Sequence, residues 1–195
     1  MNLNLNSIPT LPQVDVLVVG SGSAGATAAI TAARLGASVL LVERYGFMGG
    51  ISTQVLDTIY GFFTPGSQAR KVVGGVPDDV IGALMQANAA IYRPNTYGAG
   101  QGITYDPNML KVTWERLALA AGVRILYHTL VVDALMEGEQ VTGALLANKA
   151  GLLRQPARVV IDASGDADVA ARAGVPFESA AHGPVQSMTT TFSLI

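Results

Sequence analysis

The chain has 195 residues, a net charge of −2 and no cysteine. A charge this close to neutral, without a basic stripe, argues against a nucleic-acid partner, and the lack of cysteine excludes disulfides, thiolate metal sites and a redox-active dithiol. Half of the residues are hydrophobic and 13% are charged, so few residues are suited to face water.

The length allows one domain, or one domain and the start of another. Residues 1–13 read as a loose lead-in, and they lack the charged segment and apolar core of a secretory signal. No apolar run reaches membrane-spanning length, because Asp15, Ser21 and Arg34 interrupt the most hydrophobic region. We therefore expect a cytoplasmic protein without a membrane partner.

The stretch from Val14 to Glu43 organises the chain. A buried strand, Val14–Val19, runs into a glycine-rich turn, and an alanine-rich helix follows to about Leu35. A second apolar strand, Ser38–Val42, then ends in the acid Glu43. This order of strand, glycine-rich turn, helix, strand and acid is the full context that a dinucleotide-binding fingerprint requires.

Each part of this stretch has a physical role in binding a dinucleotide. Gly20 allows a tight turn, Gly22 lets a pyrophosphate approach the backbone, and Gly25 lets the helix pack closely on the sheet. The helix N-terminus offers free N–H groups to the phosphates, and Glu43 would accept hydrogen bonds from the ribose. The alternative, a glycine-rich turn without a ligand, does not account for all of these parts together. Both FAD and NAD contain an adenosine ribose, so Glu43 does not distinguish them.

The segment after Glu43 contains a Gly-Gly pair followed by hydroxyl residues, at Gly49–Thr53. It is either an ordinary turn at a strand end or a loop whose backbone approaches a ligand closely. Its place beside the ribose-binding acid favours the second interpretation.

The middle of the chain predicts two helices and a loop. Pro77 and the acids after it indicate a helix that runs to about Ala90, and Asp106 with Pro107 indicates an N-cap for a helix that ends at Gly122. Residues 92–102 read as a glycine-rich loop. The helical period places Trp114 in the core.

From residue 123 the period changes to that of strands. The runs Val123–Tyr127, Leu130–Leu135 and Val141–Leu146, together with Leu152 and Leu153, predict a small antiparallel meander inserted in an α/β frame. Arg158–Ile161 then resumes a buried strand.

The end of the chain predicts a short helix and one more strand. The helix begins near Val169 and ends by Gly174, and residues 186–195 read as a strand. Of the two histidines, His128 beside a strand is expected to be structural, whereas His182 lies in a predicted loop and is a weak candidate for contact with a substrate.

Three acids, Asp162, Asp166 and Asp168, follow the strand that resumes at Arg158. Their spacing does not match a calcium loop, which requires glycine at position six and glutamate at position twelve. We therefore expect no metal site, and we expect Asp166 to lie beside a cofactor or to cap a helix.

Three motifs, V-V-G-S-G-S-A-G, V-E-R-Y-G-F-M-G-G-I-S-T and V-V-I-D-A-S-G-D-A-D-V-A, together resemble the FAD-dependent oxidoreductases of the glutathione-reductase structural class. The nearest group is the bacterial FAD-dependent oxidoreductase family, distantly similar to the fumarate reductase and succinate dehydrogenase flavoproteins. The resemblance runs from about Asp15 to Phe177. It implies an α/β, Rossmann-like FAD-binding fold with a parallel sheet and an inserted antiparallel β-meander.

The resemblance also implies which residues hold FAD, motif by motif. They are Gly20, Ser21, Gly22, Ser23, Ala24 and Gly25 at the pyrophosphate; Glu43 and Arg44 at the ribose; Gly49, Gly50, Ser52 and Thr53 in the second loop; Val132, or its neighbour Val131, at the adenine; and Ala163, Ser164, Gly165 and Asp166 at the second strand end. No catalytic residue is assigned.

Members of the resembled class are about twice as long. On that comparison, residues 14–178 would form the FAD-binding domain and 179–195 the start of an incomplete substrate domain, which a second chain or a missing C-terminal region would complete. The leading hypothesis is an FAD-dependent oxidoreductase that acts on an unidentified small molecule, or the FAD-binding portion of one. The alternatives are a cofactor-binding module without catalysis and an NAD-binding enzyme of the thiazole-synthase type.

Overall fold

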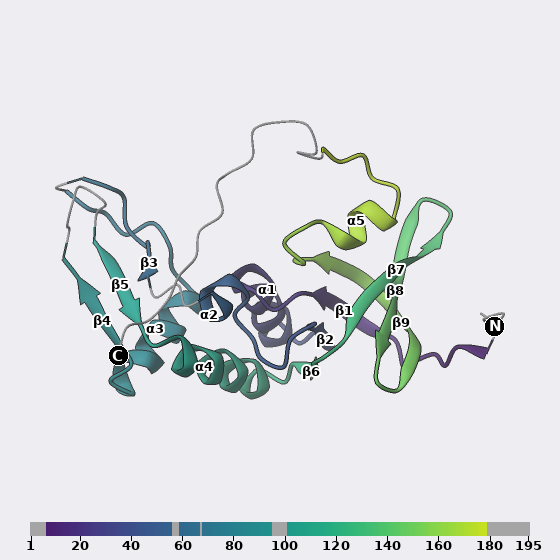
Figure 1. The fold of residues 1–195 in the computed structure, drawn as a ribbon, viewed down its shortest axis with the longest axis horizontal. Helices are drawn as coiled ribbons and strands as arrows, with labels where there is room; N and C mark the ends of the chain where they lie inside the picture. Colours follow the sequence, from purple (N-terminus) through teal and green to yellow (C-terminus); the bar gives the residue numbers. More distant parts are fainter. Residues whose placement is uncertain (1–6, 56–58, 67, 95–100, 179–195) are drawn as a thin grey trace.

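The computed structural model describes residues 7–55, 59–66, 68–94 and 101–178. Its main feature is a six-stranded sheet with the strand order β6-β2-β1-β9-β8-β7. A second sheet of three strands lies on the opposite side of the helices from the meander (Figure 1).

The parallel part of the large sheet is built on β1 (Val14–Val19). On one side β1 pairs with β2 (Val39–Val42), and on the other it pairs with the second half of β9 (Gly151–Asp162). All four residues of β2 are buried, as expected for strands of a parallel sheet that is covered on both faces. The predicted strand–helix–strand unit is therefore confirmed.

The strand β6 (Arg124–Leu126) corrects one prediction. The sequence placed this run in the antiparallel meander, but β6 pairs parallel with β2 at the edge of the sheet. The helix α4 (Pro107–Ala120) immediately precedes β6, and a strand that follows a crossover helix returns parallel to its neighbours. Periodicity alone does not show this pairing.

The meander consists of β7 (Leu130–Glu137), β8 (Gln140–Asn148) and the first half of β9. Leu152 and Leu153 and the run Arg158–Ile161, which the sequence separated, belong to one 12-residue strand. Through this strand the meander and the parallel sheet form a single sheet.

One face of the parallel strands is covered by α1 (Ser23–Arg34), α3 (Val76–Gln86) and α4. Trp114 on α4 is 2% exposed and lies in this core, as predicted. The predicted N-cap is also confirmed, because the Asp106 carboxylate accepts hydrogen bonds from the backbone N–H groups of the two residues after Pro107.

The three-stranded sheet was not predicted. It contains β3 (Ile59–Tyr60), β5 (Gly102–Tyr105) and β4 (Ala90–Arg93), paired antiparallel. Helix α3 ends at Gln86, earlier than expected, and β4 begins at the position where the sequence ended the helix. The strands are too short to show a period of two, so only their mutual pairing identifies them.

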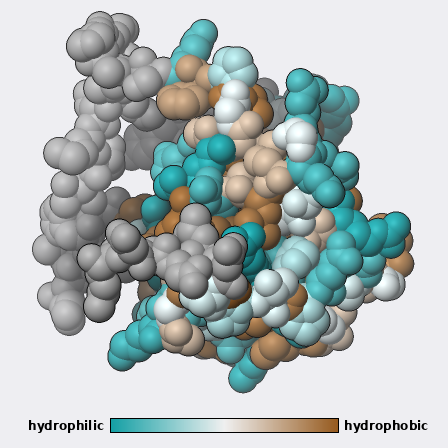
Figure 2. All heavy atoms as spheres, turned by 90° about the vertical axis from the view of Figure 1, so that its right-hand side faces the viewer, coloured by the Kyte–Doolittle hydropathy of each residue, from teal (hydrophilic) through white to brown (hydrophobic). Residues whose placement is uncertain are grey.

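The other face of the parallel strands packs against the meander. Leu17 and Leu40 of the parallel strands share a buried cluster with Ala144 and Leu146 of β8 and with Val169 of α5 (Asp168–Arg172). On the meander end of the molecule, apolar areas are broken up by hydrophilic ones (Figure 2). The fold is thus an α/β sandwich with helices on one side of the parallel strands and the meander on the other.

The described part of the lead-in is not loose. The backbone N–H of Leu11 donates to the Arg154 carbonyl at 2.8 Å, and the Arg154 N–H donates to the Pro9 carbonyl at 2.8 Å. The buried Gln155 side chain donates to the Pro12 carbonyl at 3.0 Å. These bonds attach residues 9–12 to β9. The predicted strand at 186–195, His182 and the proposed start of a second domain at 179–195 lie outside the described residues.

Candidate functional site: a cavity at the ends of the parallel strands

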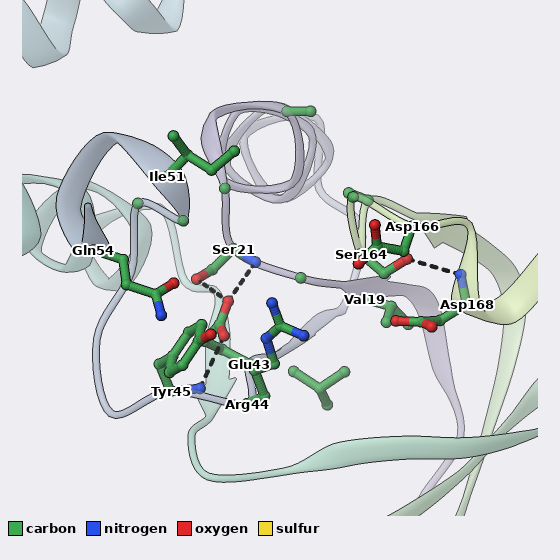
Figure 3. Close-up of a pocket in the computed structure, with 18 of the residues that line it drawn as sticks. Val19, Ser21, Glu43, Arg44, Tyr45, Ile51, Gln54, Ser164, Asp166 and Asp168 are labelled. Carbon is green, nitrogen blue, oxygen red and sulfur yellow. Dashed lines mark hydrogen bonds between the residues drawn. The ribbon is translucent and has the colours of Figure 1, made fainter. Parts of the chain in front are cut away.

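A cavity of about 400 Å³ opens at the carboxyl ends of β1, β2 and β9. Ligands of open α/β sheets commonly bind at this edge, and the volume lies within the usual range for small-molecule sites. The predicted residues that line the cavity are Gly20, Ser21, Gly22, Ser23, Ala24, Glu43, Arg44, Gly49, Gly50, Ser52, Ala163, Ser164, Gly165 and Asp166. Figure 3 shows how the labelled members of this set surround it.

The glycine-rich turn is held tightly against the sheet and the helix. Gly20 has φ +91°, and a Cβ atom there would lie 2.4 Å from the Ala163 carbonyl oxygen. A Cβ atom on Gly25 would lie 1.9 Å from the Gly20 carbonyl oxygen. Both positions therefore require glycine, Gly20 for the turn and Gly25 for the packing of α1.

Gly22 differs from these two glycines. A Cβ atom built on Gly22 meets no atom of the described part of the chain within 4 Å, and the residue lines the cavity. It also precedes α1, whose N-terminus is capped by no side chain of the described residues. The first N–H groups of α1 have no intrahelical acceptor, and the helix dipole favours an anion at this end. The open space beside Gly22 and these free donors fit the pyrophosphate of a dinucleotide.

Glu43 is 5% exposed, and three donors hold its carboxylate. Oε2 accepts from the Ser21 backbone N–H at 2.8 Å and from the Ser21 hydroxyl at 2.5 Å, and Oε1 accepts from the Tyr45 N–H at 2.9 Å (Figure 3). A buried carboxylate needs such partners. Glu43 thus joins the glycine-rich turn to the segment after β2.

Beside Glu43, four side chains form a ladder of cations and rings. The Arg44 guanidinium carbon lies 4.9 Å from the centroid of the Tyr45 ring. The Tyr45 and Phe47 rings stack with their centroids 5.9 Å apart, and Lys111 Nζ lies 4.2 Å from the Phe47 centroid. Such contacts contribute about 0.5–1 kcal/mol each at exposed sites, and here they orient Arg44 at the rim of the cavity.

The loop after Phe47 returns to the glycine-rich turn. The Gly49 N–H donates to the Ser21 carbonyl at 2.9 Å, and the hydroxyls of Ser23 and Ser52 lie 3.5 Å apart. Ser52 belongs to the short helix α2 (Ile51–Gln54). The loop therefore forms a wall of the cavity beside the N-terminus of α1.

The end of β9 forms a third side of the cavity. There the Asp162 carboxylate caps the start of α5. It accepts from the Ser164 N–H and hydroxyl and from the N–H groups of Val169 and Ala170. Burial raises the pKa of Asp162, but these four hydrogen bonds outweigh it and lower the pKa below the usual value. Asp166, the capping alternative in the sequence, is exposed and lines the cavity instead.

Three of the predicted site residues do not line the cavity. Gly25 is buried under the turn, and Thr53 donates to the Met48 carbonyl at 2.8 Å, so its role is to shape the loop. Of the two candidates for the adenine contact, Val131 lines the cavity, and Val132 lies at an irregularity in the β7–β8 register. The contact with adenine itself stays a prediction.

Sequence reasoning missed several lining residues. They are Val19, Val42, Tyr45, Ile51, Gln54, Thr129, Leu130 and Asp168. Thr129 belongs to the connection between β6 and β7, and Leu130 begins β7. The connection lies here because the Thr129 N–H donates to the Glu43 carbonyl at 3.0 Å. A prediction that β6 pairs parallel with β2 would have identified Thr129 as a lining residue. That pairing puts the connection after β6 at the same edge of the sheet as Glu43.

The His128 N–H donates to the Tyr45 carbonyl at 3.2 Å, and its ring lies against Gly46. Within the described ranges, no group of three His, Asp or Glu side chains is arranged to hold a metal ion. No helix of the described part is long and apolar enough to cross a membrane.

Comparison with known proteins shows related sequences over most of the chain. Thiamine thiazole synthase of Aeropyrum pernix is 30% identical over 169 residues, which are 81% of this chain and 57% of that protein. Fumarate reductase (cytochrome) of Shewanella frigidimarina is 41% identical over 99 residues, which are 51% of this chain and 15% of that protein. The chain thus spans 57% of the first relative and much less of the second.

The fold is shared with solved structures. The flavin-dependent brominase Bmp2 matches 84% of this chain and 41% of its own, with a TM-score of 0.59 and 24% identity. The family model described as FAD dependent oxidoreductase matches residues 15–195. With a cavity at the predicted place and a family match over nearly the whole sequence, the chain belongs to the FAD dependent oxidoreductase family.

Proposed function

We propose that this chain binds FAD in the cavity at the ends of the parallel strands and holds the adenosine-diphosphate half there. The observation that carries the proposal is Gly22, whose missing side chain leaves open space in front of the uncapped N-terminus of α1. The pyrophosphate would take the free N–H groups of α1. The ribose would bond Glu43, and the adenine would lie towards Val131.

Bound FAD would supply hydride or electron transfer to a small-molecule substrate. The described residues of the chain would bind and orient the cofactor. The N-terminus of α1, the loop at Gly49 and Gly50, and Ser52 of α2 would hold the pyrophosphate. The exposed Ile51 offers an apolar contact at the rim of the same cavity. No described residue is assigned as a catalytic acid or base.

Residues 14–178 form the FAD-binding domain in this proposal, and 179–195 would begin a substrate domain. Because the chain spans 57% of the thiazole synthase it matches, further protein, from the same or a second polypeptide, would complete the flavin side of the site. A module that holds the cofactor without turning over a substrate is the alternative in that case.

One specific observation favours a second candidate. The 30% identity to thiamine thiazole synthase extends over 81% of this chain, which supports an NAD-binding enzyme of that type. The two dinucleotides share the adenosine-diphosphate half, so the described cavity fits either. The family match favours FAD.

The test is the identity of the small molecule that the purified chain retains. We expect a flavin absorption band that a reductant bleaches, and a mass spectrum of the released molecule that matches FAD. NAD in place of FAD would support the second candidate. A protein that retains neither, and that shows no affinity for added FAD, would refute the proposal. A coloured protein that turns over no substrate would support the non-catalytic module.

A further inference from the structure

Helix α2 is a single turn that lines the cavity with three of its four residues. Ile51, Ser52 and Gln54 line the cavity, and the fourth residue, Thr53, is buried. A single helical turn is not stable by itself, because forming the first turn costs more free energy than its hydrogen bonds return. Contacts with the rest of the protein must therefore hold α2 in place.

The start of α2 is attached to the glycine-rich turn. The Gly49 N–H donates to the Ser21 carbonyl at 2.9 Å, just before α2 begins. Gly50 lies so close to the turn that a Cβ atom on it would be 2.9 Å from the Cα atom of Gly22. A displacement of α2 and its loop would therefore change the space beside Gly22, where the pyrophosphate would bind.

The other attachment of α2 comes from a distant part of the chain. Tyr105 ends β5, and its hydroxyl donates to the Ser52 carbonyl at 2.9 Å across 53 positions of sequence. The carbonyls in the last turn of a helix lack donors within the helix, and α2 is only one turn long. The Tyr105 hydroxyl thus gives the Ser52 carbonyl a donor that the helix itself does not supply.

Tyr105 is firmly held. Its side chain is 3% exposed, and its ring belongs to the same buried cluster as Met48 and Trp114. It pairs with Ala90 of β4 in the three-stranded sheet, and the next residue, Asp106, is the N-cap of α4. The hydroxyl therefore has a fixed position relative to both the small sheet and α4.

We propose that Tyr105 is a positioning residue for the cofactor, whose hydroxyl holds α2 in place as a wall of the cavity. The inference rests on the proposed function and deepens it, because Ser52 of α2 is one of the residues that would hold the pyrophosphate. Tyr105 itself does not line the cavity, so it acts through α2. The three-stranded sheet is the support from which it acts. Without this bond α2 leaves its position for part of the time, and the apparent dissociation constant of a ligand rises as the binding-competent fraction of the protein falls.

The Tyr105→Phe variant removes the hydroxyl and keeps the buried ring. The dissociation constant of FAD is measured by titration of the cofactor-free full chain, at a temperature where wild type and variant are both folded. We expect the variant to bind FAD about three- to tenfold more weakly, which is the range for one lost hydrogen bond. Hydrogen exchange of the cofactor-free protein, followed by mass spectrometry, should be faster over residues 49–55 and unchanged over β1.

The matched control is Tyr127→Phe. The Tyr127 hydroxyl donates to Glu115 Oε2 at 2.7 Å, so this variant also loses a phenol hydroxyl and its hydrogen bond, but neither residue lines the cavity. Tyr127→Phe should keep the wild-type affinity for FAD and the wild-type exchange over residues 49–55, whatever stability it loses.

The outcomes separate the inference from the function on which it rests. If Tyr105→Phe binds FAD as tightly as wild type, or if its exchange over residues 49–55 is unchanged, the positioning role of Tyr105 is overturned while FAD binding stands. An equal loss of affinity in Tyr127→Phe also overturns it, because a general loosening of the protein then explains the effect. If wild-type protein does not bind FAD, the proposed function fails and the inference fails with it.

Discussion

A Cβ atom on Gly25 would lie 1.9 Å from the carbonyl oxygen of Gly20, whereas one on Gly22 would meet no atom of the residues that the structure describes within 4 Å. Glycine is thus needed at these two positions of one short motif for different physical reasons. Gly25 is required by the packing of the protein itself. Gly22 leaves space that no described part of the protein uses, which is the property expected of a position facing a ligand.

Gly25→Ala should destabilise the fold whether or not a cofactor is present. The added methyl group would collide with main-chain atoms that cannot rotate away, and overpacking of this kind costs about 1–3 kcal/mol or more. Chemical denaturation of the cofactor-free protein measures the loss. Stability equal to that of wild type would contradict the packing described for α1 and the turn.

Gly22→Val should abolish FAD retention and leave the cofactor-free protein folded. The valine side chain would fill the space in front of the α1 N-terminus, while the local φ of −59° suits any residue. The flavin-to-protein absorbance ratio measures retention, and circular dichroism checks the fold.

Gly82→Val is a control for the Gly22 variant, because Gly82 also has open space around its Cβ position but lies on the exposed side of α3. We expect it to retain FAD as wild type does. Full flavin content in Gly22→Val would show that the pyrophosphate lies elsewhere.

Glu43→Ala should lower both stability and FAD affinity. The N–H groups of Ser21 and Tyr45 would lose a buried acceptor, which costs about 1–3 kcal/mol of unfolding free energy. Loss of the bond to the ribose would weaken FAD binding by about tenfold or more. Denaturation without cofactor and titration with FAD measure the two effects separately. A variant with lower stability but unchanged FAD affinity would reduce Glu43 to a structural role.

Asp162 should make the α5 end of the cavity sensitive to acid. Its hydrogen bonds hold the folded pKa below that of the unfolded chain. The stabilisation is therefore complete above the unfolded pKa, which is about 3.9 for Asp, and it is lost as the pH falls through the lower folded pKa.

Asp162→Asn should remove that part of the pH dependence. The variant should lose about 1–3 kcal/mol of stability at neutral pH. The Asn side chain has a single acceptor oxygen, so it cannot accept the four hydrogen bonds that the two carboxylate oxygens of Asp162 accept. Denaturation midpoints measured from neutral to acidic pH check both effects, with Asp166→Asn at an exposed position as the control. Parallel pH curves for wild type and Asp162→Asn would contradict the assignment.

Much of the site could be predicted because local sequence determines its parts. The strand Val14–Val19, the three glycines, the helix after them and Glu43 are adjacent in the chain, and each meets a requirement that neighbouring residues impose. The loop at Gly49 and Gly50 and the end of β9 were predicted to belong to the site because their motifs resemble those of the family. These segments line the cavity as expected.

What the sequence could not decide depends on contacts between distant segments. The pairing of β6 with β2, the union of the meander with the parallel sheet through β9, and the pairing of β3 with β5 in the small sheet all rest on hydrogen bonds between strands far apart in the chain. Val131 rather than Val132 lines the cavity, and this too depends on where β7 lies in space.

The sequence by itself determined the dinucleotide fingerprint, because glycine, helix start and acid act through covalent neighbours and backbone geometry. The tertiary structure alone decided how these residues share their hydrogen bonds. It set the Ser21 hydroxyl on Glu43 across 22 positions of sequence and gave the capping of α5 to Asp162 rather than Asp166. Hydrogen bonds of this kind depend on distance and angle in space, which spacing along a chain does not specify.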